Sequence, residues 1–323
     1  MKKKNNEMVN NVFHTEHTYI ILLPIYNEGN LLNDFLNILE NKLTNINVFF
    51  KIVFVNDGST DNSVQIINNH NFNSKNLTKE IIELNGNGGQ QNAIRSGLNY
   101  VNNNYKNIYG VIVMDADGED NPDALSELIE IKDYDVVFVT RGKREESYFF
   151  KISYIFYKLI FKIITGKQIN FGNYSMISPK VLNNIAEKHY FHYSAFLSKQ
   201  KFNIKKIQYN RNKRINGVSK MGFKNLFIHA LKSFTEYSEE LIFFQIKVFL
   251  TILLSFSGFS IYVFYSKFIS KKALIGWSSN LMIGLINGLL IMFSSIIIST
   301  LLLIIKNSMD QKNIYLTKNN LPK

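Results

Sequence analysis

The sequence predicts an α/β fold, with a mostly parallel sheet followed by interfacial helices and two C-terminal transmembrane helices. Runs typical of strands alternate with runs typical of helices from residue 19 to about residue 140, which is the pattern of βαβ units. Near the C-terminus, the ranges 248–266 and 273–305 contain no charged residue, and a bilayer is crossed by roughly 20 apolar residues. Two buried core helices are the alternative, but the second range lacks the polar stripe of a soluble helix.

The expected elements follow one another along the first half of the chain. Short apolar runs, most of them rich in β-branched residues, predict strands at 19–23, 49–55, 81–84, 111–114 and 135–140. Apolar residues at helical spacing predict helices over 31–43, after Asp61, around 93–101 and around 125–129. Asn121 and Pro122 are typical of a helix cap and first turn.

The composition excludes several classes of protein. With 46% hydrophobic and 19% charged residues in 323, the chain is expected to fold around a core. It has no cysteine, so disulfides and thiolate chemistry are excluded. The net charge of +12 favours an anionic partner, which could be nucleic acid, a membrane surface or a phosphorylated substrate. No motif that reads nucleic acid is present, so nucleic-acid binding is not expected.

A polar cluster follows each expected strand. In chain order these clusters are Pro24 to Glu28, Asp57 with Gly58, Asn87 to Gln91, Asp115 with Asp117, and Arg141. The carboxyl ends of parallel strands share one edge of a sheet, where ligands bind in open α/β folds. We therefore expect the five clusters to lie around one site.

Asp115 and Asp117 are the central pair of this site. Two carboxylates at alternate positions after a strand can hold Mg²⁺ or Mn²⁺ together with the phosphates of a substrate. A surface turn is the alternative, because Asp-x-Asp-Gly is also common in loops.

The ligand is expected to be a nucleoside diphosphate. The glycine-rich loop at 86–90 does not match the dinucleotide fingerprint, and no Gly-Lys-Ser/Thr follows a strand. The carboxylate pair, Arg141 and Arg144 suit a diphosphate, while Glu28 and Asp57 can accept hydrogen bonds from a base or ribose.

These motifs resemble those of family 2 glycosyltransferases, most of all the polyprenyl-phosphate enzymes of the dolichol-phosphate mannose synthase and bactoprenol glucosyltransferase type. The segments that carry the resemblance are Leu-Pro-Ile-Tyr-Asn-Glu (23–28), Val-Asn-Asp-Gly-Ser-Thr-Asp (55–61), Asn-Gly-Gly-Gln-Gln-Asn-Ala (87–93), Met-Asp-Ala-Asp (114–117), the basic segment 211–220 and Gly276-Trp277. The resemblance covers most of the chain.

The resemblance implies a GT-A fold and a role for each matching residue. The nucleotide would be bound by Pro24, Tyr26, Glu28, Asp57 and Gln91, and the metal by Asp115 and Asp117. The catalytic set would comprise Asp115, Asp117, Arg141, Arg211, Arg214 and Lys220, the last three on a mobile loop near the two phosphates. Ser219 lies on the same loop and, with Arg144, would contact the acceptor or sugar.

The segment 170–176 departs from the family pattern. Where the polyprenyl-phosphate enzymes usually carry Asp-x-Gly-Asp-Phe-Arg-Leu, Asn173 replaces a carboxylate and Ser175 replaces an arginine. An amide cannot act as a base, so the two residues are expected to mark an altered acceptor or sugar site.

The chain is expected to divide into five parts. These are a basic tail (1–17), a GT-A domain (18–222) with an amphipathic interface helix near 148–165, a juxtamembrane helix (223–245), a transmembrane hairpin (246–306) and a C-terminal tail (307–323). A helix packed against the sheet is the alternative for both amphipathic segments. Lysines do not settle the orientation, but nucleotide sugars are made in the cytosol, so the catalytic domain is expected to face it from the cytoplasmic membrane.

The predicted function is an inverting, metal-dependent transfer of a sugar from a nucleotide diphosphate sugar to a membrane polyprenyl phosphate, feeding cell-envelope glycan synthesis. The divalent cation would be Mg²⁺ or Mn²⁺, and the bilayer is an expected partner. The sequence leaves open whether the chain forms a homo-oligomer. Two alternatives remain, namely transfer to a lipid-linked saccharide or other hydroxyl, and a non-catalytic nucleotide-binding membrane scaffold.

Overall fold

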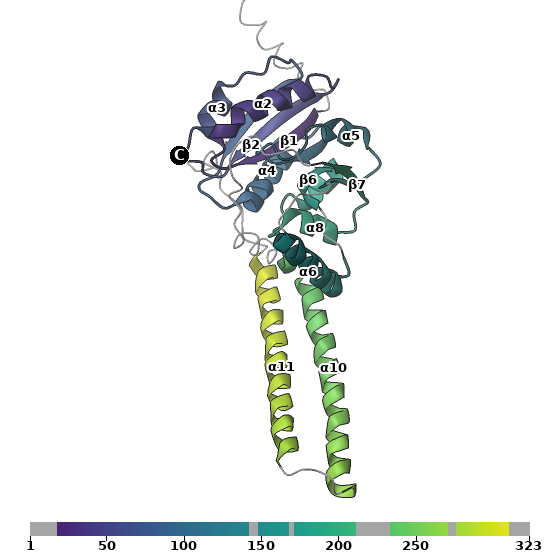
Figure 1. Ribbon diagram of the computed structural model, residues 1–323. Coiled ribbons are helices and arrows are strands. Elements are labelled where there is room, and N and C mark those ends of the chain that lie inside the picture. The colour runs from purple at the N-terminus through teal and green to yellow at the C-terminus, as the bar shows by residue number, and fades with distance from the viewer. Residues whose placement is uncertain (1–17, 142–147, 168–170, 211–232, 271–275, 310–323) are drawn as a thin grey trace, which may run out of the picture. The chain divides into compact units, whose positions relative to one another are not determined.

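The computed structural model describes residues 18–141, 148–167, 171–210, 233–270 and 276–309 (Figure 1). These residues divide between two compact units. The sheet unit holds those numbered up to 151 and those of 171–236, and the helical unit holds 152–167 and the residues from 237 onward.

The sheet unit contains a seven-stranded sheet with the order β3-β2-β1-β4-β6-β5-β7. The strands are β1 (Thr18–Ile25), β2 (Phe49–Asn56), β3 (Leu77–Glu83), β4 (Ile108–Val113), β5 (Val136–Arg141), β6 (Phe171–Ile177) and β7 (Ile204–Tyr209). The neighbours of β1, β2 and β3 are all parallel, and β5 is parallel to β7. Only β6 runs antiparallel, between β4 and β5. The predicted mostly parallel sheet is confirmed.

The helices of the sheet unit lie between these strands in the chain. They are α2 (Gly29–Leu43), α3 (Ser63–Asn69), α4 (Gln90–Asn104), α5 (Ala124–Glu130), α7 (Pro179–Ile185) and α8 (Tyr193–Lys199). Successive residues of β1 point to opposite faces of the sheet, so Ile21 and Leu23 join one core cluster while Ile20 and Leu22 join the other. Both faces are therefore covered, as a parallel sheet requires.

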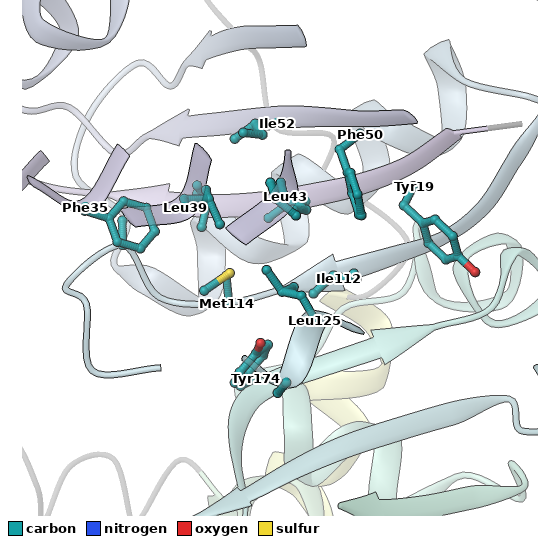
Figure 2. Packing of buried hydrophobic residues seen from close by; sticks show 14 of the residues in the cluster. Tyr19, Phe35, Leu39, Leu43, Phe50, Ile52, Ile112, Met114, Leu125 and Tyr174 are labelled. Carbon is teal, nitrogen blue, oxygen red and sulfur yellow. The ribbon is translucent and has the colours of Figure 1, made fainter. Parts of the chain in front are cut away.

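The first core cluster packs α2 and α5 on one face of the sheet. Figure 2 shows Phe35 and Leu39 of α2 among the buried side chains of this cluster, together with Leu125 of α5 near Ile112 of β4. The helix residues recur every three or four positions, so they form one apolar stripe that is buried against the strands.

The second core cluster packs α4, α7 and α8 on the opposite face. Helix α4 approaches the sheet closely at Gly97. A Cβ atom there would lie 2.6 Å from Leu22 Cδ1 and 2.7 Å from Val55 Cγ2, and both of those side chains are fully buried. The glycine thus fixes how near the helix lies to β1 and β2.

The helical unit contains two helices that are long and apolar enough to cross a membrane. Helix α10 (Ser238–Phe264) continues into the π-helical turn η1 (Tyr265–Ile269), and α11 (Trp277–Met309) lies beside α10 (Figure 1). The rings of Phe249 and Phe293 are 6.2 Å apart, which marks the contact between the two helices. The first predicted span (248–266) falls within α10 and η1, and the second (273–305) coincides with α11 from Trp277 onward, whereas residues 273–275 lie outside the described ones. Helix α10 also includes the end of the expected juxtamembrane segment, whose residues 223–232 lie outside the described ones.

Helix α6 (Tyr148–Thr165) belongs mostly to the helical unit. Phe161 is buried against the ring of Tyr237, with centroids 5.1 Å apart in a T-shaped arrangement. Other apolar side chains of the helix are exposed, among them Ile155 at 65% and Phe156 at 63%. The segment is a helix over the predicted range, with one side packed and another side apolar and exposed.

Candidate active site

The turn after β1 is bonded to the turn after β2. Asn27 adopts a left-handed backbone conformation, with φ at 54°, and its side-chain Oδ1 accepts from the Thr60 N–H at 2.8 Å. Its own N–H donates to Ser59 Oγ at 3.0 Å, and the Glu28 N–H donates to Ser63 Oγ at 3.0 Å. The two turns therefore form one rigid wall at the carboxyl edge of the sheet.

Asp61 caps the helix that follows β1. Its Oδ2 accepts from the Gly29 N–H at 2.9 Å, and its Oδ1 accepts from the Ser63 N–H at 3.0 Å. Burial alone would raise the pKa of the Asp61 carboxyl, but the hydrogen bonds from Ser63 and Gly29 outweigh it and lower the pKa. The sequence predicted a helix after Asp61, and this carboxylate also holds the start of α2, which precedes it in the chain.

Asp57 braces the glycine-rich turn that precedes α4. Its Oδ1 accepts from the Gly88 N–H at 2.8 Å and its Oδ2 from the Gly89 N–H at 2.7 Å. The residue is only 2% exposed, and burial raises the pKa of its carboxyl although the two N–H donors lower it. We expected Asp57 to contact the nucleotide, and in the structure its carboxylate serves the neighbouring turn.

Gln90 and Gln91 open α4 and reach in different directions. The side-chain amide of Gln90 donates to Asp115 Oδ1 at 2.6 Å. Gln91 is buried, and its Oε1 accepts from the Tyr193 N–H at 2.6 Å while its Nε2 donates to Asn173 Oδ1 at 3.2 Å. The resemblance pointed to Gln91 as a nucleotide-binding residue, and in the structure the glutamine that contacts the carboxylate pair is its neighbour Gln90.

The carboxylate pair lies on a tight turn after β4. Asp120, which is 7% exposed, accepts from the Asp115 N–H at 2.9 Å, and the Glu119 N–H donates to Asp117 Oδ1 at 3.0 Å. Gly118 allows this turn because its φ is 76°. Asp115 and Asp117 are both half-buried, whereas Asp120 acts on the backbone, a role that the sequence reasoning missed.

Asn173 and Ser175 on β6 are enclosed in the protein. Asn173 is 7% exposed and bonds to Gln91, while Ser175 is fully buried and shares a 3.0 Å hydrogen bond with the Tyr193 hydroxyl. We expected both residues to contact the acceptor or the sugar. Because the Ser175 side chain has no exposed surface, the structure instead gives it an internal role beside α8.

Of the remaining predicted site residues, some are described by the structure and others lie outside the described ranges. Pro24 lies in β1 opposite Val55 of β2, and Tyr26 follows that strand with 41% of its surface exposed. Arg141 is the last residue of β5, in register with Tyr209 of β7. The predicted residues that lie outside the described ones are Arg144, Arg211, Arg214, Ser219 and Lys220.

The described site therefore has three parts at one edge of the sheet. Asp57 holds the glycine turn, this turn leads into Gln90, and Gln90 bonds to Asp115. Within the described ranges, no group of three or more His, Cys, Asp or Glu side chains is arranged to hold a metal. Such an edge can bind an anionic ligand through backbone N–H groups and a cation through carboxylates.

Comparison with known proteins agrees with this architecture. The profile of the family described as Glycosyl transferase family 2 matches residues 20–197. The chain is 28% identical over 291 residues to "Uncharacterized glycosyltransferase YkcC" of Bacillus subtilis (strain 168), covering 86% of this chain and 87% of the relative.

Two further comparisons concern the expected branch and the fold. The chain is 31% identical over 139 residues, 42% of its length and 41% of the relative's, to "Undecaprenyl-phosphate 4-deoxy-4-formamido-L-arabinose transferase" of Edwardsiella ictaluri (strain 93-146), in keeping with the expected polyprenyl-phosphate type. Its fold resembles the crystal structure of mannosyl-3-phosphoglycerate synthase from Rubrobacter xylanophilus, with a TM-score of 0.51, 12% identity, and 74% of this chain and 76% of the other covered. The expected GT-A-like fold is confirmed. With a family match over more than half of its length and this site at the edge of its sheet, the chain belongs to glycosyl transferase family 2 and is a glycosyltransferase.

Proposed function

We propose that the protein transfers a sugar, with inversion, from a nucleotide diphosphate sugar to a membrane polyprenyl phosphate. The observation that carries the proposal is the link from Asp57 through Gly88 and Gly89 to Gln90 and Asp115, at the carboxyl edge of parallel strands. The same chain has two helices long and apolar enough to span a membrane, which suits a lipid acceptor.

The donor nucleotide would lie against the turns after β1 and β2. Tyr26 is exposed there, and Glu28 directly precedes α2, the helix whose first N–H is bonded to Asp61. Asp57 and Gln91 support this wall from inside, because their side-chain atoms bond to the glycine turn and to Tyr193. A rigid wall lowers the cost of ordering the site when the nucleotide binds.

The carboxylates of Asp115 and Asp117 fit a divalent cation. Mg²⁺ in such sites takes one or two carboxylates and completes its shell with substrate phosphates and water, so a pair of half-buried aspartates is a sufficient set of protein ligands. When bound, Mg²⁺ or Mn²⁺ supplies positive charge to the leaving diphosphate.

The acceptor needs no strong general base. A phosphate monoester is already ionised near neutral pH, so its oxygen can attack the anomeric carbon directly. The bond from that carbon to the donor diphosphate breaks, and the nucleoside diphosphate leaves with the electron pair. The neutral and buried Asn173 is consistent with this chemistry, and transfer to a hydroxyl would need a base that this residue cannot provide.

Cations for the two phosphates are proposed from the sequence. Arg211, Arg214 and Lys220, with Ser219, would hold the diphosphate and the acceptor phosphate, since guanidinium groups form paired hydrogen bonds with phosphate oxygens. Arg141 would act from the end of β5.

The membrane placement is part of the proposal. The two apolar helices would form a hairpin in the cytoplasmic membrane, with the catalytic domain facing the cytoplasm, where nucleotide sugars are made. The exposed Ile155, Phe156 and Leu159 of α6 would enter the lipid interface, because water-exposed apolar groups of this size favour that environment.

A donor screen tests the proposal. Membranes from cells that express the chain are incubated with Mn²⁺ and a panel of nucleotide sugars, and lipid products are identified by mass. We expect one donor to yield a polyprenyl phosphate sugar. Asp117→Ala should lower that transfer by about a hundredfold or more, because it removes charge that stabilises the leaving group.

Asp133→Ala, at an exposed position away from the site, is the matched control and should transfer at the wild-type rate. The proposal is wrong if no donor gives a polyprenyl phosphate sugar, or if the product carries the sugar on a hydroxyl.

A further inference from the structure

Gln90 is a side chain from outside the aspartate turn that bonds to a carboxylate oxygen of the pair. Its Nε2 lies 2.6 Å from Asp115 Oδ1, a short hydrogen bond for an amide donor. The two residues are 25 positions apart in the chain and come from different elements, α4 and the turn after β4. This bond therefore depends on where the fold places α4.

Three constraints fix the start of α4. Asp57 accepts from the backbone N–H groups of Gly88 and Gly89, and so holds the turn that leads into Gln90. About two turns further on, Gly97 lets the helix lie directly on β1 and β2. Gln91 anchors the first turn of α4 to the protein interior, because its Oε1 accepts from the Tyr193 N–H.

The direction of Gln90 follows from these constraints. Neighbouring residues of a helix point about 100° apart. When Gln91 points inwards to Tyr193 and Asn173, Gln90 is turned toward the sheet edge and reaches Asp115. The buried anchor of Gln91 thus sets the position of an amide that acts at the site.

Asp115 is held both at its main chain and at its carboxylate. Asp120 accepts from its backbone N–H, which fixes the main chain, and Gln90 donates to its Oδ1, which limits rotation of the carboxylate. A carboxylate whose orientation is fixed before a cation arrives loses less entropy when it binds.

We propose that Gln90 is a positioning residue that orients the Asp115 carboxylate for the divalent cation. The inference rests on the proposed function, since it assumes that Asp115 and Asp117 bind a cation with the donor diphosphate. It assigns to Gln90 the role that partners of metal ligands have in other metal sites, where their loss weakens metal binding by 10–100-fold.

The direction in which cation binding changes when Gln90 is removed separates a positioning role from the alternative. If Gln90 only occupied an oxygen that the cation needs, its removal would strengthen cation binding. A positioning role requires that removal weaken it.

The experiment uses the full chain purified in detergent, with Mn²⁺ as the probe. Free Mn²⁺ is measured by its paramagnetic resonance signal during titration, in separate series with UDP, GDP, CDP and dTDP. Gln90→Met keeps the length of the side chain but lacks the donor. Gln65→Met is the matched control, because Gln65 is exposed on α3.

We expect the Mn²⁺ dissociation constant of Gln90→Met to rise about tenfold, with the control unchanged. In transfer assays the Mn²⁺ concentration for half-maximal rate should rise by the same factor, and the rate at saturating Mn²⁺ should fall much less. The thermal unfolding midpoint without metal should match that of the control, which separates positioning from a damaged fold.

An unchanged or tighter Mn²⁺ dissociation constant for Gln90→Met overturns this inference alone. The same holds if the variant loses Mn²⁺ binding only together with a lowered unfolding midpoint. Wild-type protein that binds no Mn²⁺ with any of the four nucleotides overturns both this inference and the cation-dependent part of the proposed function.

Discussion

Single residues at this site act mainly on neighbouring turns. Asp57 and Asp120 accept hydrogen bonds from backbone N–H groups of turns, and Asp61 accepts from the first N–H of α2. Carboxylates that follow parallel strands thus have two roles here, since Asp115 and Asp117 form the proposed cation site and others hold the neighbouring backbone. Sequence motifs cannot separate the two uses, because the residue type is the same.

The cap formed by Asp61 gives a prediction for stability. Asp61→Asn keeps the shape of the side chain but replaces one acceptor oxygen by a donor, so the thermal unfolding midpoint should fall at neutral pH. The pKa of Asp61 is lowered in the folded protein, so its stabilising effect is complete above the unfolded value of about 3.8. The effect is lost as the pH falls through the folded pKa.

The measurement is the difference in midpoint between wild type and Asp61→Asn from pH 7 down to the acid limit of folding. That difference should be constant to about pH 5 and shrink below pH 4. Asp34→Asn, at an exposed position on α2, removes the same charge and should leave the midpoint near the wild-type value. Equal effects of the two substitutions would contradict a capping role.

The start of α4 shows how far the site could be predicted. The glycine and glutamine cluster at 87–91 was expected at the sheet edge, and it lies there. Which glutamine reaches the carboxylates could not be predicted, because one residue of helix rotation decides it and that rotation is set by the distant Tyr193. Asn173 was expected at the acceptor for a similar reason, since a motif position does not reveal burial.

At the scale of elements, the spacing of α4 from the sheet depends on Gly97. Gly97→Val would bring a Cβ atom to 2.6 Å from Leu22 and 2.7 Å from Val55, which is closer than van der Waals contact allows, and both of those side chains are fully buried. We expect the free energy of unfolding to fall by about 1–3 kcal/mol, as for other overpacked cores. Helix propensity does not offset this cost, because valine and glycine differ little there.

Asn103→Val introduces the same side chain at an exposed position of α4 and serves as the control. Denaturant unfolding of both variants provides the comparison. A Gly97→Val variant as stable as Asn103→Val would show that the helix is not held at this distance.

The strands that could be predicted from the sequence are those with continuous apolar runs. The ranges 19–23, 49–55 and 111–114 fall within or beside β1, β2 and β4, which are buried on both faces. The first half of β3 was missed because Thr78, Lys79 and Glu80 belong to an edge strand with exposed positions. The other missed strands, β6 and β7, contain glycine, asparagine, serine or lysine, which weaken the apolar pattern.

For the whole molecule, the proposed topology can be tested with single cysteines, because the natural chain has none. Asn45→Cys lies at an exposed position of the sheet unit, and Lys267→Cys lies in the turn η1. A membrane-impermeant maleimide added to intact cells should label Lys267→Cys, while Asn45→Cys should react only after the cells are opened.

This outcome follows if α10 and α11 form a hairpin with the catalytic unit in the cytoplasm. Labelling of both positions in intact cells would place the sheet unit outside. Labelling of neither before lysis, with both reactive afterwards, would mean that no hairpin crosses the membrane.

The position of β6 has a consequence for how the protein is made. The chain leaves the sheet unit after residue 151, forms most of α6 in the helical unit, and returns to place β6 between β4 and β5. During synthesis the edge of β4 therefore stays open until residues 171–177 have been made, after the apolar helix α6. Removing α10 and α11 would not free a water-soluble catalytic fragment, because α6 with its exposed Ile155 and Phe156 lies inside the same stretch of chain. An excised sheet unit needs either a redesigned α6 or a new link that joins β5 directly to β6.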